Sequence, residues 1–414
     1  MVPRYEVNPA FQAPFYLPTS AHLLLLPAWL VNQVFQGDAG FDIRWTGLTY
    51  GSIAALAFWL VLPLVWRLPL WRRAALLILL AIVYVDPQYV APMNSFYTDT
   101  ASLAMLLLVA AFAARQVTGE GDPKRNAWGI ALSAVLLVSS KIQHSLLFLP
   151  LLILFLWRPE LLRPLGRHGR WGAMTALTAA GLGCIASAPI EYSAPASYNV
   201  VFLNLLPNSS DPLRTLRELG IPEQFVVFAH TDAYQAGSAL INPELRRQLV
   251  PLLSHGKLAA YLLRNPGEAW RLLLLGLSEA SLQRPDYGNF TKDTGLPPST
   301  RSEAFAFWSG AKLWMFERRP VLLLGFCILL GVGVPLLAWR ARPRAMPTVL
   351  AVSAMLGIEL GLSSLGDVKD TTRHLFLFLV LLDLLAVCAV ALLLAPRTVS
   401  TPLPTRSRAG RARR

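Results

Sequence analysis

Apolar residues form long blocks along the chain, separated by short polar turns that are rich in arginine. Blocks of this kind predict membrane-crossing helices, because a helix needs about 20 mainly apolar residues to span the hydrocarbon core of a bilayer. The sequence therefore predicts an all-α polytopic membrane protein with about nine transmembrane helices. The predicted spans lie near residues 46–66, 74–92, 97–115, 127–140, 144–157, 171–189, 320–339, 346–366 and 374–395.

The basic residues predict how these spans are oriented, because cytoplasmic loops of membrane proteins are enriched in lysine and arginine. If the spans alternate in direction, one set of turns and the tail hold most of the arginines, and their only acids are Glu120, Asp122 and Glu160. We expect this side, including the C-terminus, to be cytoplasmic. Its basic residues are Arg67, Arg72, Arg73, Arg115, Lys124, Arg125, Arg158, Arg163, Arg167, Arg170, Arg340, Arg342, Arg344, Arg397, Arg406, Arg408, Arg411, Arg413 and Arg414.

The same rule divides residues 127–157 into two short spans. Arg125 and Arg158 both belong to the basic side, so the chain must cross and return between them. One long helix would place them on opposite sides. The predicted outer turn is Lys141-Ile142-Gln143-His144.

Composition narrows the class of protein further. The chain is 54% hydrophobic and only 15% charged, whereas soluble domains contain about 25% charged residues. This excludes a soluble enzyme, a disordered chain and a disulfide scaffold. The net charge of +13 does not indicate nucleic-acid binding, because the orientation of the spans accounts for it. Cys184, Cys327 and Cys388 lie inside apolar blocks, which favours a packing role.

Five regions follow from this pattern. Residues 21–35 are too short for a comfortable span and are predicted to form a helix in the outer interface. The segment before the first block must lie outside, yet no signal peptide or earlier span precedes it, so we expect a first span to be missing from this chain. The regions are a periplasmic segment with the interfacial helix (1–45), six transmembrane helices (46–189), a periplasmic loop domain (190–319), three transmembrane helices (320–396) and a basic cytoplasmic tail (397–414).

The loop domain contains a predicted helix–turn–helix. The segment LAAYLLR is followed by Asn265 as an N-cap, Pro266 at the first helical position, and the segment EAWRLLLLGLSEA. Such helices would pack on each other or lie on the membrane surface.

Acidic residues near the outer ends of two spans are candidates for catalysis. Asp86 lies near the end of one block, and Asp99 lies in NSFYTDTASL at the start of the next. A carboxylate near the hydrocarbon edge needs water, a cation or a partner. Asp99 is therefore a candidate catalytic base or a ligand of a divalent cation. Alternatively, Thr98 or Asp99 caps the helix.

Basic residues at two other outer turns are candidates for binding a lipid-linked phosphate. Lys141 and His144 lie between the two short spans, and Arg373 and His374 lie in GDVKDTTRHLFLF before the last span. A cation at this depth suits a phosphate at the membrane surface. The alternatives are that Lys141 and His144 reach ordinary lipid headgroups, and that Thr371 or Thr372 caps a helix while Asp370 pairs with Arg373.

Two acids lie deeper in the predicted spans. Glu359 and Asp383 occur in neighbouring blocks, and Asp383 lies near mid-membrane. Buried acids of this kind face the interior of a helix bundle, where they are hydrogen-bonded or protonated.

Several segments together resemble GT-C membrane glycosyltransferases. In that superfamily an outer loop with interfacial helices ends in the pattern G-D-x-x-F-x-x-R, matched here by Gly37, Asp38, Phe41 and Arg44. The segment SFYTD is similar to the acidic part of the second outer loop. SKIQH and DTTRHLFLF resemble segments of bacterial cell-surface glycan hexosyltransferases. The resemblance covers about residues 8–145 and 360–385.

The resemblance implies transfer of a sugar from a polyprenyl-phosphate donor to a cell-envelope glycan, lipid or protein on the outer face of a bacterial inner membrane. Family members place a catalytic acid in the first outer loop, and here only Glu6 precedes the interfacial helix. If the acid lies upstream, this chain alone would be inactive. Two alternatives are a glycan polymerase or ligase with a pyrophosphate-linked donor, and a non-enzymatic transporter or assembly scaffold.

Overall fold

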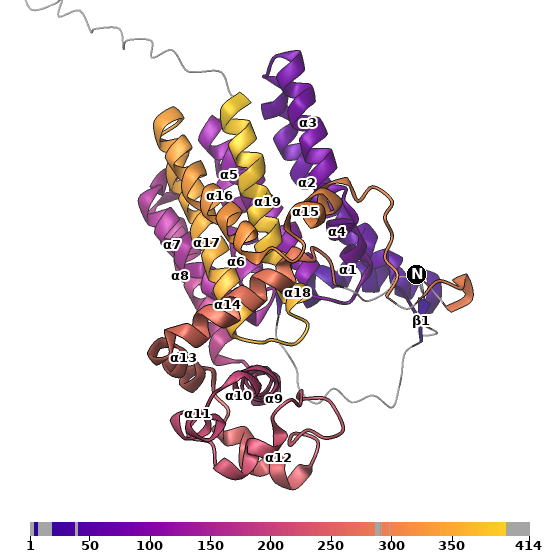
Figure 1. Ribbon diagram of the computed structural model, residues 1–414. Helices are drawn as coiled ribbons and strands as arrows, with labels where there is room; N and C mark the ends of the chain where they lie inside the picture. The colour runs from indigo at the N-terminus through magenta and orange to yellow at the C-terminus, as the bar shows by residue number, and fades with distance from the viewer. Residues whose placement is uncertain are drawn as a thin grey trace, which may run out of the picture.

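The computed structural model describes residues 4–6, 19–37, 40–285, 290, 292–297 and 299–394. The described chain is mainly helical (Figure 1). Its strands are β1 (Arg4–Tyr5) and β2 (Phe41–Asp42), which pair antiparallel with Arg4 opposite Asp42. The predicted basic tail and the predicted loop motif residue Asp38 lie outside the described residues.

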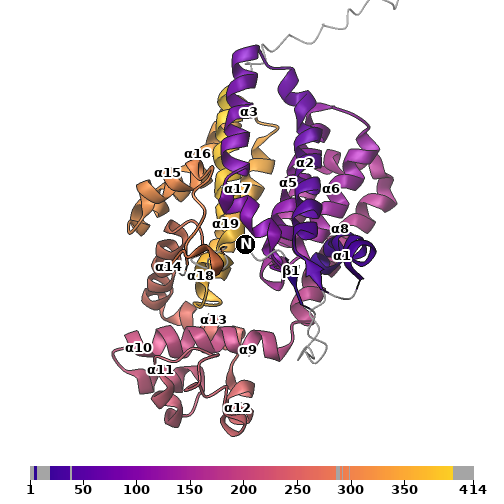
Figure 2. The same cartoon turned by 90° about the vertical axis from the view of Figure 1, so that its right-hand side faces the viewer.

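Long helices run side by side at each of the predicted apolar blocks (Figures 1 and 2). They are α2 (Arg44–Trp66), α3 (Leu70–Tyr84), α5 (Asp99–Thr118), α6 (Pro123–Val138), α7 (Phe148–Trp157), α8 (Gly166–Ala186), α16 (Pro320–Ala341), α17 (Met346–Leu365) and α19 (Phe376–Leu394). Their apolar side chains share one large core, which runs from α2 through α19.

The number of helices that are long enough to cross a membrane is smaller than the nine that the sequence predicted. In the described residues, five are long and apolar enough to cross a membrane: α2, α5, α16, α17 and α19. Two bent pairs raise the number to seven. Leu70–Tyr84 continues at 50° into Pro87–Asn94, which comprises α4 (Pro87–Val90) and η2 (Ala91–Asn94). Arg163–Ala186 continues at 68° into Ile190–Asn208.

The two short blocks form separate elements, in agreement with the prediction against one long helix. α6 ends at Val138, and the chain turns at residues 139–141. It then enters η3 (Ile142–Leu147), which leads into α7. This turn brings Lys141 and His144 to one end of the bundle.

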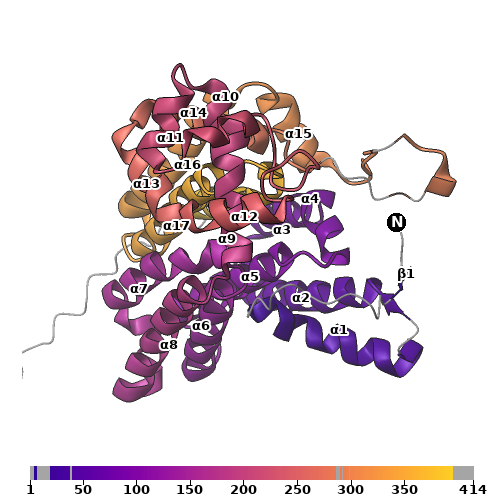
Figure 3. The ribbon, with the colours of Figure 1, turned by 90° about the horizontal axis from the view of Figure 1, so that it is seen from below.

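The helix predicted over residues 21–35 is α1 (Ser20–Gln36). It lies flat at the edge of the bundle when the molecule is seen from below (Figure 3). Ser20 ties its start to α6, because the Ser20 backbone N–H donates to the Ser139 carbonyl. Leu23, Trp29 and Phe35 are exposed along it, as expected for a helix that contacts lipid.

The region after α8 has a second hydrophobic core of its own, built from residues between Ala194 and Leu272. This unit lies below the bundle (Figure 1). Its elements are α9 (Ile190–Tyr198), η6 (Asn199–Leu205), α10 (Leu206–Asn208), α11 (Pro212–Leu219), η7 (Glu223–Phe228), α12 (Pro243–Leu249), η8 (Val250–Leu252) and α13 (His255–Arg264).

The predicted helix–turn–helix is α13 followed by α14 (Pro266–Ser281). Asn265 occupies the predicted N-cap position of α14, but its side chain makes no capping hydrogen bond. The side chain instead donates to the Glu218 carboxylate and the Tyr261 carbonyl. α14 packs on α17 at Gly276, where an added Cβ would overlap the Ser364 side chain. The second helix of the motif therefore joins the membrane bundle.

The basic turns lie together at the end of the bundle opposite the loop unit. Arg67 pairs with Glu120, Arg115 donates to the Leu60 carbonyl, and Arg72 donates to the Leu394 carbonyl. These contacts join turns that are far apart in the sequence. They gather these basic residues at one end of the bundle.

Candidate functional site

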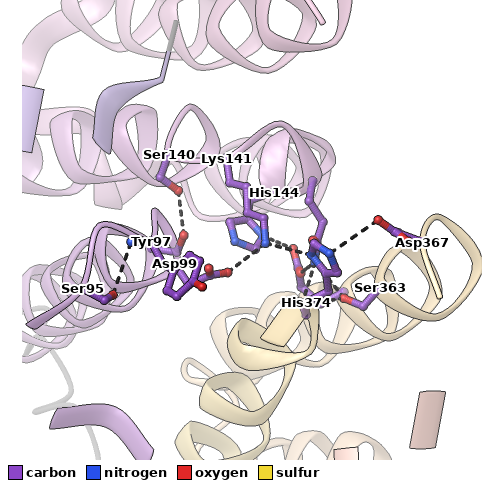
Figure 4. A network of polar contacts seen from close by, with 12 residues as sticks. Ser95, Tyr97, Asp99, Ser140, Lys141, His144, Ser363, Asp367 and His374 are labelled. Atoms are coloured by element: carbon purple, nitrogen blue, oxygen red, sulfur yellow. Dashed lines mark hydrogen bonds and ion pairs between the residues drawn. The ribbon is translucent and has the colours of Figure 1, made fainter. Parts of the chain in front are cut away.

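A cluster of buried and partly buried polar side chains lies at the end of the bundle that contacts the loop unit. Figure 4 shows this cluster from close by. Its members come from three separate parts of the chain: the start of α5, the turn between α6 and α7, and the segment from α17 to α18 (Thr371–His374). The residues are Asp99, Ser140, Lys141, Gln143, His144, Glu359, Ser363, Asp367, Arg373 and His374.

Asp99 and Lys141 form a buried ion pair at the centre of this cluster. Lys141 Nζ lies 2.9 Å from Asp99 Oδ1, and the two side chains are 7% and 6% exposed. Beside them, the Ser140 and Ser102 hydroxyls are 2.8 Å apart. Removing either charge alone would leave the other without compensation in a low-dielectric environment, which is costly. Thr98 occupies the N-cap position of α5, but its side chain makes no capping hydrogen bond.

His144 pairs with Glu359, and both side chains are fully buried. His144 Nδ1 lies 2.8 Å from Glu359 Oε1, and Gln143 Nε2 donates to Glu359 Oε2 at 3.1 Å. A carboxylate oxygen accepts, so we assign the His144 proton to Nδ1, where it is donated to Glu359. His144 Nε2 is then an acceptor, and it is buried without a hydrogen-bond partner among the described residues.

His374 links the Asp99–Lys141 pair to Asp367. Lys141 Nζ lies 3.2 Å from His374 Nδ1, and His374 Nε2 lies 3.7 Å from Asp367 Oδ2. An ammonium group can only donate, so His374 accepts at Nδ1 and carries its proton on Nε2. Burial, followed by the charges of Lys141 and Arg373, holds the pKa of His374 well below its ordinary value. His374 is therefore neutral at pH 7.

Asp367 connects the cluster to the loop unit. Burial raises its pKa to about 6, opposed by hydrogen bonds from the Lys369 backbone and the Asn199 side chain. Asn199 Nδ2 donates to Asp367 Oδ1 at 3.1 Å, and Lys369 Nζ contacts Asp232 at 3.1 Å. Asn199 and Asp232 belong to the loop unit. These two contacts therefore connect the loop unit to the turn that carries His374.

Arg373 lies over an aromatic ring at the edge of the cluster. Its guanidinium carbon is 4.8 Å from the ring centroid of Tyr97, within the range of a cation–π contact. The predicted threonine cap of this helix is wrong, because Asp370 occupies the N-cap position of α18 in a left-handed conformation. Thr372 instead donates to Glu279 of α14 at 2.7 Å.

The structure brings together Asp99, Lys141, His144, Arg373 and His374, which the sequence predicted as separate candidates at three outer turns. Glu359 also joins them, and the sequence identified it only as a buried acid without naming its partner. Asp99, Lys141 and His144 are almost fully buried, whereas Asp367, Arg373 and His374 are partly exposed.

Asp86, the other predicted catalytic acid, has a different environment. Its Oδ1 accepts from the Gln88 N–H at the start of α4. Its Oδ2 accepts from the Trp308 and Ser309 N–H groups at the start of α15 (Phe307–Phe316). Asp86 is fully buried. It thus joins two helix starts, and among the described residues its hydrogen bonds do not reach the cluster around Asp99.

A second buried ion pair was not predicted from the sequence. Lys312 Nζ of α15 lies 2.7 Å from Asp383 Oδ2, and the side chains are 2% and 0% exposed. Tyr89 also donates to the same oxygen. Asp383 therefore faces the bundle interior as predicted, but Lys312 lies within the region assigned to the outer loop. The sequence feature that could have indicated this pair is the single lysine in the apolar segment FWSGAKLWMF.

The side chains around Asp99 do not fit a divalent cation. The nearest partner of the carboxylate is an ammonium group. Within the described residues, no group of three or more histidines, cysteines or acids is arranged to hold a metal. The predicted cation at Asp99 therefore has no matching donor set, and we derive no step through a metal.

Comparison with known proteins identifies the family. Residues 1–411 match the YfdI N-terminal transmembrane domain. The chain belongs to that family. No curated protein and no solved structure matches the sequence. Membership in the YfdI transmembrane-domain family, together with the apolar helices, makes this a multi-pass membrane protein.

Proposed function

We propose that the chain is a membrane glycosyltransferase that transfers a sugar from a polyprenyl-phosphate donor to a cell-envelope glycan, lipid or protein. The observation that carries this proposal is the convergence of Lys141, Arg373 and His374 with Asp99 and the His144–Glu359 pair. These groups combine a phosphate-binding set with a proton acceptor at one end of a membrane bundle. The glycosyltransferase-like character of the YfdI family supports it.

The proposed arrangement has nine membrane crossings, the loop unit in the periplasm and the tail in the cytoplasm of a bacterial inner membrane. α6 and η3–α7 are short for a crossing, and local thinning of the bilayer accommodates such helices at modest cost. The separation of basic turns from the loop unit supports this orientation.

Labelling of single cysteines tests the orientation. In a background without Cys184, Cys327 and Cys388, Gln235→Cys is expected to react with a membrane-impermeant maleimide added outside. Arg125→Cys is expected to react only after the membrane is permeabilised. Both positions are exposed on the protein. Labelling of position 235 only from the cytoplasmic side would contradict the proposed orientation.

Lys141, Arg373 and His374 are assigned to the donor phosphate. Arg373 presents parallel donors that match two phosphate oxygens, and Lys141 supplies a compact charge. Neutral His374 donates from Nε2 without adding charge. As the bond between the sugar carbon and the phosphate oxygen breaks, the leaving phosphate gains negative charge, which these donors stabilise.

His144 is assigned as the base that accepts the proton of the acceptor hydroxyl. The hydroxyl oxygen forms the new bond to the sugar, the polyprenyl phosphate leaves with the old bonding pair, and the proton moves to His144 Nε2. Glu359 orients the ring through Nδ1 and stabilises the imidazolium that forms, which is the logic of a base held by a carboxylate. Asp99, paired with Lys141, is assigned to holding that lysine in place.

Substitution of Arg373 tests the phosphate assignment. Arg373→Lys is expected to lower donor efficiency roughly five- to two-hundred-fold, because a point charge replaces two parallel donors. Arg373→Ala is expected to lower it further. The measurement is transfer from a polyprenyl-phosphate sugar, normalised to protein in the membrane. Arg264→Lys, at an exposed arginine at the end of α13, is the matched control. Unchanged transfer in Arg373→Ala would remove Arg373 from the site.

A further inference from the structure

A basic cavity lies at the opposite end of the bundle from the candidate site. Its volume is about 330 Å³, and it is lined by Arg163, Gly166, Arg167, Arg170 and Trp171. Small-ligand sites begin at about 300 Å³, so this volume suits a compact group such as a phosphate ester. The residues belong to η5 (Arg163–Leu165) and the first turns of α8.

The arginines of this cavity have no acidic partner in the described part of the chain. Glu160, the acid closest to these arginines in the sequence, pairs with Arg158, and Glu120 pairs with Arg67. Within the same described residues, Arg170 Nε is buried and has no hydrogen-bond partner. Like charges that line one cavity repel each other, and this repulsion is relieved when an anion binds between them.

The backbone at the cavity adds to the positive potential. α8 begins beside it without a side-chain cap and without an acid in its first turn. The first N–H groups of a helix bind anions readily. Gly166 has φ of +73° and open space where a Cβ would lie, so the chain approaches the cavity with little bulk.

The exposed face of α8 indicates that the ligand is a lipid. From Trp171, exposed positions continue along α8 as a broad face, at 172, 175, 176, 179, 182, 183, 185 and 186. This face starts at the cavity and leads toward the centre of the membrane. A headgroup in the cavity would place its acyl chains along it. Trp171 itself, 51% exposed and 5.4 Å from the Arg170 guanidinium, suits the membrane–water boundary.

We propose that this cavity is a binding site for the headgroup of an anionic phospholipid. Arg163, Arg167 and Arg170 bind the phosphate, and Trp171 contacts the glycerol region. The site is separate from the proposed transfer site and does not depend on it.

Native mass spectrometry of the full chain in detergent tests the proposal. The probes are phosphatidylglycerol, phosphatidylcholine, inorganic phosphate and glycerol 3-phosphate. Arg167→Gln combined with Arg170→Gln is expected to weaken binding of phosphatidylglycerol about tenfold or more, because two charge-assisted contacts are lost. Lys124→Gln combined with Arg125→Gln, which removes two exposed basic residues at the start of α6, is the charge-matched control and is expected to retain binding.

Each alternative outcome is distinguishable. Equal weakening in the Arg167→Gln, Arg170→Gln variant and in the Lys124→Gln, Arg125→Gln control would indicate general surface attraction and overturn the site. Equally tight binding of phosphatidylcholine in the wild type would remove the role of net charge. Glycerol 3-phosphate or inorganic phosphate binding as tightly as the lipid would identify a soluble phosphate ligand and overturn the lipid assignment. A melting temperature equal to that of the wild type establishes that the double variant is folded.

Discussion

Replacement of His144 by asparagine is expected to lower the rate of sugar transfer by about 10²–10⁴-fold, the usual contribution of a general base. The asparagine amide retains a donor that reaches toward Glu359, but it removes Nε2, the buried acceptor without a partner in the described structure. Donor affinity is expected to change little, because the proposed phosphate ligands are other residues. The measurements are transfer rate and donor binding on the same preparation.

Two further variants separate a catalytic role of His144 from a structural one. Glu359→Gln retains the hydrogen-bonding shape but loses the charge that stabilises the imidazolium, so the transfer rate is expected to fall while donor affinity stays close to that of the wild type. His230→Asn is the matched control: His230 lies in the loop unit with φ of 70°, a conformation that asparagine adopts well. Normal transfer by folded His144→Asn would exclude His144 as the base.

Replacement of Lys312 by methionine is expected to destabilise the protein by about 3–5 kcal/mol, because it leaves the Asp383 carboxylate buried without its ammonium partner. Lys312 and Asp383 are 2% and 0% exposed. The free energy of unfolding is measured by denaturant titration in detergent. The double variant Lys312→Met, Asp383→Leu removes both charges and is expected to recover most of this loss.

The control for this effect is an exposed lysine. Lys124→Met removes the same charge at the start of α6, where the side chain is exposed, and is expected to change stability by less than about 0.5 kcal/mol. Equal stability of Lys312→Met and the wild type would show that the pair does not hold α15 in the bundle.

The positions of the long helices followed from the sequence because lipid imposes a strong requirement on apolar length. The required apolar length alone did not predict how many helices are long enough to cross the membrane. α6 ends at Val138 and α7 begins at Phe148, so both are short, and the bend after Tyr84 divides another block. Helix ends and bends depend on local contacts, such as the Asp86 cap at α4, which hydropathy does not report.

The residues of the candidate site that could be predicted from the sequence are the charged and histidine side chains near the ends of predicted spans. Asp99, Lys141, Arg373 and His374 each stood at an outer turn, and alternation of the spans placed those turns at one end. Glu359 was different, because its depth in α17 marked it as buried but its pairing with His144 depends on how α17 packs against η3. Lys312 was missed because α15 lies within a long segment that was assigned as a whole to the outer loop.

Transfer in proteoliposomes tests the central claim most directly. The purified chain is reconstituted with radiolabelled polyprenyl-phosphate hexoses and a bacterial envelope extract as the source of acceptor. We expect the wild type to transfer label from a polyprenyl-phosphate donor, and the combined Lys141→Met, Arg373→Ala variant to lose transfer while the Arg264→Lys control retains it. Absence of transfer by the folded wild type, or transfer only from a pyrophosphate-linked donor, would contradict the proposed function.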